Sequence, residues 1–298
     1  MNGIILIDKP KNFTSFDVVA KMRKICNTKK IGHAGTLDPL ATGVLPILIG
    51  SATKVQELLQ NSDKEYLATF QLGITTDTQD ITGKILNIKD VNVDINLLKN
   101  VLHKFEGEIQ QIPPMYSAIK YNGKKLYELA RNGISIDRKA RRIKINSISL
   151  IDFDDKNNIV KILISCSKGT YIRTLCSDIG AYLGCGSTLT DLRRTKACSF
   201  NISDCISIND LEEFAINNTL SKKIIDISST LFKYDKVSIT EKQNIRFKNG
   251  GALNLDRLKI KSIQDKKILR VFYNDTWIGL GIINLQKKQL DIFKNLTI

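Results

Sequence analysis

The chain has 298 residues, 42% of them hydrophobic, which is enough to bury one large core and a smaller one. Its 45 lysines and arginines against 30 aspartates and glutamates give a net charge of +15, which favours a polyanionic partner. No segment approaches the roughly 18 consecutive apolar residues of a spanning helix, so an α-helical membrane protein is excluded. We therefore expect a cytoplasmic protein with no secretory signal and no membrane partner.

The cysteines and histidines argue against a structural metal site. Six cysteines occur without a Cys-x-x-Cys pair, and His33 and His103 are the two histidines of the sequence. In a cytoplasmic chain this pattern predicts reduced, mostly buried thiols rather than a disulfide framework.

The first elements along the chain are a short strand over residues 3–8 and a helix introduced by Thr-Ser-Phe-Asp at 14–17, which has the form of a capping box. Apolar residues at helical spacing predict the face that this helix buries: Phe16, Val19, Met22 and Ile25.

Further elements follow from alternating or helical periodicity. Strands are predicted over 44–49, 66–72, 143–150 and 160–166, and helices over 97–105, 125–131 and 171–183. Because strands and helices mix without a strict βαβ repeat, the fold class is predicted to be α+β.

A domain boundary is predicted at residues 218–236, where polar stretches interrupt the periodicity. Residues 235–298 contain short, strand-like segments and a turn signal at Gly250-Gly251. They carry 13 lysines and arginines against six acidic residues. We expect a catalytic domain over 1–225 and a small β-rich domain over 235–298. A solvated β-domain that only supports the core is the alternative.

The most informative segment is the glycine-rich loop at 31–45, which presents one carboxylate, Asp38, directly before Pro39. Proline fixes its own φ and favours an extended Asp38. Three glycines permit turns or close backbone approach: Gly32, Gly35 and Gly43. An isolated Asp-Pro would more often be an Asx turn, so the surrounding residues decide between a turn and a presented acid.

Four blocks of sequence resemble the TruB family of pseudouridine synthases, and the resemblance covers nearly the whole chain. The blocks are Asp8-Lys9-Pro10 within 3–15, the Asp38 loop, Lys64-Glu65-Tyr66 with 73–80 and 113–120, and Gly-Thr-Tyr-Ile-Arg-Thr at 169–174. In this order and spacing the blocks are highly specific. The resemblance implies a pseudouridine synthase fold, with a mixed, largely antiparallel central sheet flanked by helices, and isomerisation of a uridine in RNA.

The resemblance also implies the residues of the active site. Asp38 matches the essential catalytic aspartate, and Arg173 matches the arginine that pairs with it and would keep it ionised in a water-poor pocket. Tyr66 matches a tyrosine that stacks on the target base, although an alternating strand aromatic is by itself more often a core residue. Tyr171 and Leu192 match residues that line the same pocket.

Two further residues receive a substrate role from the same resemblance. His33 matches a histidine that fills the space left by flipped nucleotides, whereas a lone histidine is more often structural. Lys9 is expected either to pack against the catalytic loop or to contact RNA. The isomerisation requires no cofactor and no metal, and Asp38 would act on C1', on C6 or through a glycal route.

The implied substrate is uridine 55 in the T loop of tRNA. Nine basic residues against two acidic ones at 120–146 fit an insertion that grips the T arm, with a solvated charged face as the alternative. The family resemblance implies that 235–298 is a PUA-like RNA-binding domain. We expect a monomer without an obligatory protein partner, because the first motif begins at residue 3.

Two rival functions remain open at this stage. A guide-RNA-dependent relative would share the catalytic motifs, and an RNA-folding chaperone would keep the fold without relying on catalysis. Intact Asp38, Tyr66 and Arg173 favour an enzyme, which could also assist tRNA folding.

Overall fold

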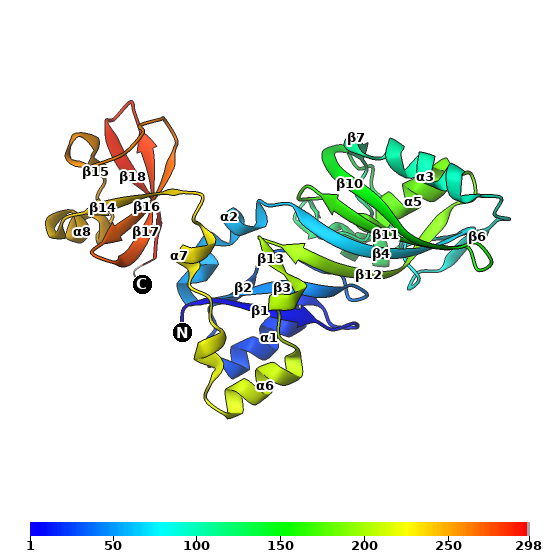
Figure 1. Ribbon diagram of the computed structural model, residues 1–298, viewed down its shortest axis with the longest axis horizontal. Coiled ribbons are helices and arrows are strands. Elements are labelled where there is room, and N and C mark those ends of the chain that lie inside the picture. The colour runs from blue at the N-terminus through cyan, green and yellow to red at the C-terminus, as the bar shows by residue number, and fades with distance from the viewer. Residues whose placement is uncertain (297–298) are drawn as a thin grey trace.

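The computed structural model describes residues 1–296 and contains two β-sheets that follow one another along its longest axis (Figure 1). The larger sheet and its helices precede residue 217, and the smaller sheet begins at residue 235. The predicted α+β class is confirmed. The division into domains over 1–225 and 235–298 stays a prediction, and residues 297 and 298 lie outside the described part.

The larger sheet has nine strands within the described residues, and all its pairs are antiparallel except the short pair between the second and third strands of its main path. The main path runs through β1 (Gly3–Lys9), β3 (Thr42–Ile49), β12 (Ser187–Ala197), β4 (Lys64–Leu72), β11 (Ile159–Cys166), β10 (Arg141–Asp154) and β7 (Gly107–Gln111). Two short strands extend it, β2 (Ile31–His33) on β3 and β13 (Phe200–Asn201) on β12. The predicted mixed, largely antiparallel sheet is therefore confirmed.

Helices pack on this sheet in two groups. Helices α1 (Ser15–Ile25) and α6 (Ile208–Ile216) share a core with β1 and β3, whereas α3 (Ile95–Lys104) and α5 (Ile172–Tyr182) share a core with β4, β10 and β11. Between β3 and β4 the chain forms a 3-10 turn (Gly50–Val55) and α2 (Gln56–Gln60). Every helix of residues 1–296 is too short or too polar to span a bilayer.

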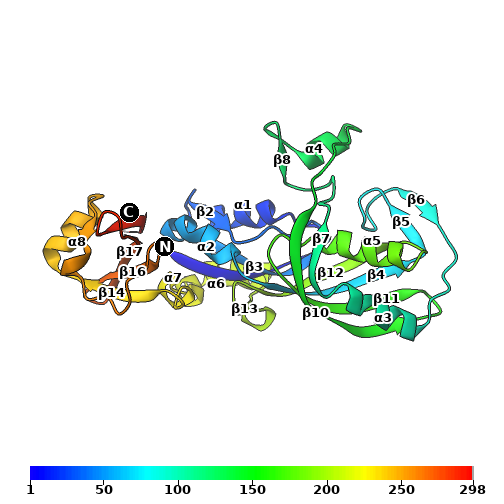
Figure 2. The ribbon, with the colours of Figure 1, turned by 90° about the horizontal axis from the view of Figure 1, so that it is seen from above.

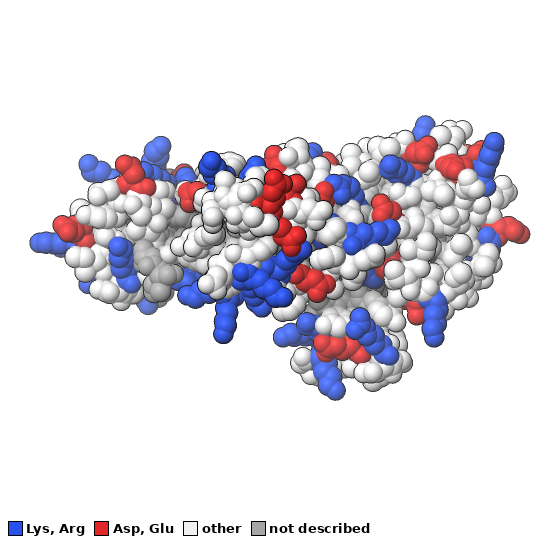
Figure 3. Space-filling model, turned by 90° about the horizontal axis from the view of Figure 1, so that it is seen from below, with Lys and Arg blue, Asp and Glu red and all other residues white. Residues whose placement is uncertain are grey.

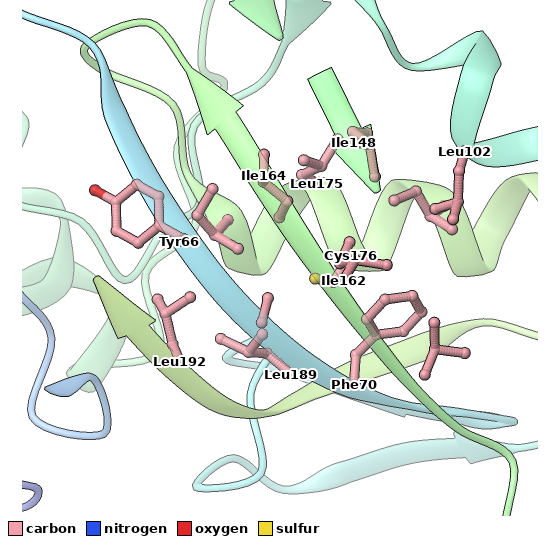
Figure 4. Close-up of a cluster of buried hydrophobic side chains, with 14 of the residues drawn as sticks. Tyr66, Phe70, Leu102, Ile148, Ile162, Ile164, Leu175, Cys176, Leu189 and Leu192 are labelled. Carbon is pink, nitrogen blue, oxygen red and sulfur yellow. The ribbon is translucent and has the colours of Figure 1, made fainter. Parts of the chain in front are cut away.

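Strict alternation on β4 fixes which side chains reach the second core. Tyr66, Ala68 and Phe70 are buried on one face, and the residues between them are half-exposed, because successive strand residues point to opposite faces. Figure 4 shows Tyr66 and Leu192 together at one end of this cluster, with Phe70 further along the strand. The predicted strand over 66–72 is confirmed, and its register places Tyr66 at the edge of the core.

The apolar face predicted for α1 is wrong at Phe16. The capping box is present, with Thr14 and Asp17 exchanging hydrogen bonds, but the buried residues are Ser15, Val18, Val19 and Met22. The Phe16 side chain is 61% exposed. Val19 and Met22 are buried and Ile25 packs against the same core, so the prediction holds at these three residues, and Ser15 takes the buried place in the first turn that Phe16 was expected to take.

The smaller sheet has five strands in the described part of the chain. They lie in the order β14 (Asp235–Ile239), β16 (Ile268–Tyr273), β17 (Thr276–Asn284), β18 (Gln289–Asn295) and β15 (Leu253–Asn254). A helix, α8 (Glu241–Lys248), interrupts the predicted strand-like pattern, and Thr240 caps it. The predicted boundary region also contains a 3-10 turn (Leu220–Lys223) and α7 (Ile227–Thr230).

Two hairpins extend beyond the larger sheet. One pairs β5 (Ile74–Thr76) with β6 (Ile85–Ile88). The other is β8 (Lys120–Tyr121) with β9 (Lys124–Lys125), followed by α4 (Leu126–Arg131), and Figure 2 shows this segment projecting away from the sheet. The basic residues predicted at 120–146 therefore lie on a projecting segment and on the start of β10.

The cysteines of the described residues are free thiols, and most of them are buried, as the sequence predicts: Cys166, Cys176, Cys185 and Cys198 are buried, and Cys26 and Cys205 are half-buried.

Candidate active site

Asp38 lies in the loop between β2 and β3, and hydrogen bonds from α1 and from the segment before α1 hold this loop. The hydroxyl of Ser15 on α1 accepts a hydrogen bond from the Leu37 amide at 2.8 Å and donates one to the Leu37 carbonyl at 3.1 Å. The amide of Asn12 donates to the Pro39 carbonyl at 2.9 Å. Backbone groups on both sides of Asp38 are thus fixed, so the carboxylate has a defined position.

The carboxylate of Asp38 faces the guanidinium of Arg173, which stands in the first turn of α5. Arg173 Nε lies 2.9 Å from Asp38 Oδ2, and the two terminal nitrogens donate to the carbonyls of Thr78 at 3.1 Å and Tyr116 at 2.8 Å. Arg173 Nη1 is also 3.5 Å from Asp80 Oδ2. The predicted pairing of the two residues is present in the structure, and every nitrogen of this guanidinium has a partner.

Burial differs sharply across this pair. The side chain of Arg173 is 6% exposed and that of Asp38 is 42% exposed. The expected water-poor pocket around Asp38 is therefore not present in this structure, because the loop lies at the surface with the arginine beneath it. The buried cation is shared by two carboxylates, which leaves the more exposed one available to a substrate.

A small, shallow and open depression lies in front of the pair. Its lining combines the charged groups with an apolar wall: Asp38, Leu40, Ala41, Asp80, Arg173, Leu189 and Leu192. Leu192 comes from β12, directly opposite Ala68 of β4 in the sheet. An apolar wall beside an ion pair is suited to hold a planar ring next to a carboxylate.

Two tyrosines lie near this depression on separate elements. Burial raises the pKa of Tyr66, which is 8% exposed and comes from β4, and its hydroxyl therefore stays protonated at neutral pH. Tyr171 precedes α5, and its amide and carbonyl are both hydrogen-bonded by the side chain of Gln111 at 2.8 and 3.0 Å. Burial also raises the pKa of Tyr171, while the hydroxyl of Ser117 acts in the opposite direction.

Family models cover most of the chain that forms this site. The model described as "TruB family pseudouridylate synthase (N terminal domain)" matches residues 23–172, and "tRNA pseudouridylate synthase B C-terminal domain" matches residues 173–231. The chain belongs to the TruB family. It is therefore a pseudouridine synthase, as its sequence motifs predicted.

Curated TruB relatives match along nearly their full length. The chain is 45% identical over 94% of its length to tRNA pseudouridine synthase B of Clostridium tetani, covering 95% of that protein. It is also 45% identical over its full length to the protein of the same name from Clostridium acetobutylicum, which it covers completely.

Solved structures agree with the family assignment. A structure titled "Crystal Structure of a Cbf5-Nop10-Gar1 Complex" is 27% identical with a TM-score of 0.74, covering 99% of this chain and 85% of that one. An H/ACA RNP bound to a substrate RNA containing 2'-deoxyuridine gives a TM-score of 0.74 at 25% identity, covering 99% of this chain and 85% of that one.

His33 lies at the end of β2 in this TruB-family chain, five residues before Asp38. Burial lowers its pKa, and the nearby guanidinium of Arg194 lowers it further, so the ring is neutral at pH 7. Its buried Nδ1 has no hydrogen-bond partner within the described residues. No hydrogen bond from Nδ1 therefore holds the imidazole ring in place, as one would for a histidine with a purely structural role.

Lys9 is fully buried at the end of β1. Its ammonium donates to the carbonyls of Phe13 at 2.6 Å, Pro10 at 2.9 Å and Pro39 at 3.4 Å. Burial lowers its pKa to about 8, while the charge of Asp38 acts in the opposite direction. Of the two roles expected for Lys9, packing against the catalytic loop fits these contacts, and direct contact with RNA does not fit its burial.

Arg194 is a site residue that the sequence analysis missed. It is 1% exposed, and its guanidinium donates to the carbonyls of Val44 at 2.8 Å, Gly35 at 3.0 Å and Thr36 at 3.4 Å. The available signal was its position two residues after Leu192 on a strand, which places both side chains on one face. Arg194 therefore holds the other end of the loop that carries the carboxylate.

Asp80 was part of a recognised motif, but no role was assigned to it. Its side chain is 6% exposed beside Arg173, and its carboxylate also accepts hydrogen bonds from the hydroxyls of Thr78 and Thr82 at 2.9 and 2.5 Å. The sequence alone gave no indication that the motif at 73–80, which contains Asp80, contacts the motif at 169–174, which contains Arg173.

Proposed function

We propose that this chain converts uridine 55 in the T loop of tRNA into pseudouridine, with Asp38 as the essential carboxylate. The observation that carries the proposal is the pairing of the surface carboxylate of Asp38 with the buried guanidinium of Arg173 at an open, apolar-walled depression. Relatives named tRNA pseudouridine synthase B support tRNA as the substrate.

The reaction breaks the bond between N1 and C1', rotates the uracil, joins C5 to C1' and removes the proton from C5. No electron is gained or lost overall, so the step requires no redox partner. Asp38 acts as a nucleophile at C1' or C6, or as the base of a glycal route. Arg173 orients the carboxylate, because its Nε lies 2.9 Å from Asp38 Oδ2 while its other nitrogens are held by backbone carbonyls.

A uridine in a folded loop reaches Asp38 only after it leaves its stack, which costs a few kcal/mol for unstacking. In the proposed complex the uracil enters the depression against Leu192, with Tyr66 stacking on it and Tyr171 at its edge. The nucleotide then excludes the water that reaches Asp38 in the structure described here. His33 fills the space that the flipped nucleotide leaves, and its neutral ring suits a position among bases.

Binding of the T arm is assigned to the projecting basic segment within 120–146, through shape and phosphate contacts. Residues 235–298 are proposed to form a PUA-like domain that binds the same RNA. Lys9 positions the catalytic loop rather than touching RNA. We propose that the protein acts in the cytoplasm as a monomer, without an obligatory protein partner.

The test is release of tritium from a tRNA transcript labelled at C5 of uridine. Wild-type protein is expected to release tritium, Asp38→Asn is expected to bind the transcript with unchanged affinity but release none, and a transcript altered only at position 55 is expected to be inert. Tight binding without release by wild type would contradict the proposal and favour an RNA-folding role. Equal losses of affinity and turnover in Asp38→Asn would contradict the role of the carboxylate.

A further inference from the structure

Phe16 is an exposed aromatic residue next to the catalytic loop. It is 61% exposed on the first turn of α1, and it directly follows Ser15, whose hydroxyl exchanges hydrogen bonds with Leu37. Leu37 precedes Asp38 in the chain. Phe16 is therefore adjacent in the chain to the residue that holds the Asp38 loop, while its ring is exposed to solvent and has no part in the depression described above.

Arg23 lies over this ring. Seven residues along a helix correspond to nearly two turns, so Phe16 and Arg23 share one face, with the small side chain of Ala20 between them. Long helical side chains point toward the N-terminus, and Arg23 Cζ comes to 5.4 Å from the centre of the Phe16 ring. Its buried Nε has no hydrogen-bond partner in the described chain. The Arg23 guanidinium thus lies over one face of the Phe16 ring, and it does not cover the opposite face.

The surroundings of the pair are strongly basic. Residues 11–30 contain six lysines and arginines against one acidic residue, Asp17, whose carboxylate accepts hydrogen bonds from Thr14. Lys21 pairs with Glu212 at 2.7 Å, whereas Lys24, Lys29 and Lys30 are exposed. Exposed cations on α1 and on the segment that follows it are complementary to the phosphates of a nucleic acid, and the exposed aromatic ring at the start of the same helix is suited to stack on a base.

The position of this surface also fits an RNA that reaches the active site. Figure 2 shows α1 and the projecting α4–β8 segment on the same side of the larger sheet. Figure 3 shows lysine and arginine side chains near the middle of the molecule, with acidic side chains among them, beside that projecting segment. An RNA held by the insertion would therefore pass over the same side of the sheet as Phe16.

We propose that Phe16 and Arg23 form a stacking site for an unpaired nucleobase of the RNA substrate, separate from the pocket for the target uridine. Lys24 on α1, and Lys29 and Lys30 between α1 and β2, bind phosphates farther along the same RNA strand. The inference rests on the proposed function for the identity of the RNA. Base–aromatic stacking tolerates any base, so this site contributes affinity and does not select a sequence.

The first test measures the Kd for the tRNA transcript in a Phe16→Leu variant, which keeps an apolar side chain on the helix but removes the aromatic face. Loss of one stack is expected to weaken binding about tenfold. Tyr182→Leu is the matched control. Tyr182 is a similarly exposed aromatic residue on α5, 56% exposed, and the Lys104 ammonium of α3 lies 4.9 Å from the centre of its ring. The control is expected to bind with wild-type affinity.

A second measurement reads the stack directly. Phe16→Trp is made together with Trp277→Phe, which removes the single native tryptophan, and Trp277→Phe alone gives the baseline. Addition of the transcript is expected to quench the new fluorescence, because a base would stack on the indole. Unchanged affinity in Phe16→Leu, or absence of quenching at saturating RNA, would overturn the inference.

Two outcomes separate this inference from others. A Phe16→Leu variant that changes the sedimentation of the protein but not its affinity for RNA would identify a protein contact and overturn the stacking site. Absence of tritium release by wild type would contradict the proposed function, whereas release by wild type together with unchanged RNA affinity in Phe16→Leu would contradict only the stacking site.

Discussion

Two sets of cations with the same chemistry occupy opposite environments in this protein. Beneath the loop that carries Asp38, three cations are buried and donate to backbone carbonyls or pair with carboxylates: Lys9, Arg173 and Arg194. On the projecting insertion, Lys124 and Lys139 are exposed to solvent. The basic residues behind the net charge of +15 therefore fall into two groups. The buried group holds the Asp38 loop in place, and the exposed group remains available to phosphates.

The comparison is tested most strongly at Arg173. Replacing it by lysine in Arg173→Lys keeps the charge but removes the planar group that reaches Asp38, Thr78 and Tyr116 together. Single-turnover tritium release is expected to fall by about 10²- to 10³-fold, the usual loss for an oriented charged group in an active site. Thermal unfolding shows whether the variant is folded, and a folded variant with a nearly wild-type rate would show that charge alone suffices.

The next largest effect is expected on stability at Arg194. Arg194→Met leaves the carbonyls of Gly35, Thr36 and Val44 without this donor inside the fold. The free energy of unfolding, measured by denaturant titration, is expected to fall by about 3 kcal/mol. Arg142→Met is the matched control, because that side chain is 73% exposed, and it is expected to change stability by less than about 0.5 kcal/mol. Equal effects of the two variants would remove the distinction between the two groups.

Lys9 gives a smaller effect with a defined pH dependence. Its pKa of about 8 in the folded protein lies below the value of 10.5 for an ordinary lysine, so between these values the unfolded chain binds more protons than the folded one. Stability contributed by this group therefore rises as the pH increases from about 8 to about 10.5. The difference in denaturation midpoint between wild type and Lys9→Met is expected to shift in favour of wild type over this range. A constant difference would mean that the ammonium is not desolvated.

The smallest effect is expected on the exposed side of the comparison. Lys124→Ala removes one phosphate contact of the insertion, so the Kd for tRNA is expected to rise a few-fold. The slope of log K against log salt is expected to become shallower by about 0.9, the contribution of one released counterion. A salt titration of binding measures both quantities, and an unchanged slope would indicate that this lysine belongs to a solvated surface.

The resemblance of the motifs predicted the pairing of Asp38 with Arg173, which the structure contains, whereas their roles stay predictions. Alternation predicted the strand that carries Tyr66, but the sequence left open whether this side chain belongs to the core or to a base-binding pocket. Helical spacing failed at Phe16, because Ser15 takes the buried place in the first turn of α1 and its hydroxyl bonds the Asp38 loop. Burial of Lys9 and Arg194 was not predictable from hydropathy, since long charged side chains are rarely fully buried. Their carbonyl partners are brought together only by the fold.

The short parallel contact between β3 and β12 has a consequence for the order of folding. A side chain at Gly43 would place its Cβ 2.2 Å from the Arg194 carbonyl, so the two backbones meet where only glycine fits. Arg194 and its partner Val44 are 150 residues apart in the chain. Contacts of such long range form late because the intervening loop must first close. During synthesis on the ribosome, the N-terminal third of the protein would thus emerge with the Asp38 loop held by Lys9, Asn12 and Ser15 alone. The contacts of Arg194 with Gly35, Thr36 and Val44 would be added only after β12 has left the exit tunnel.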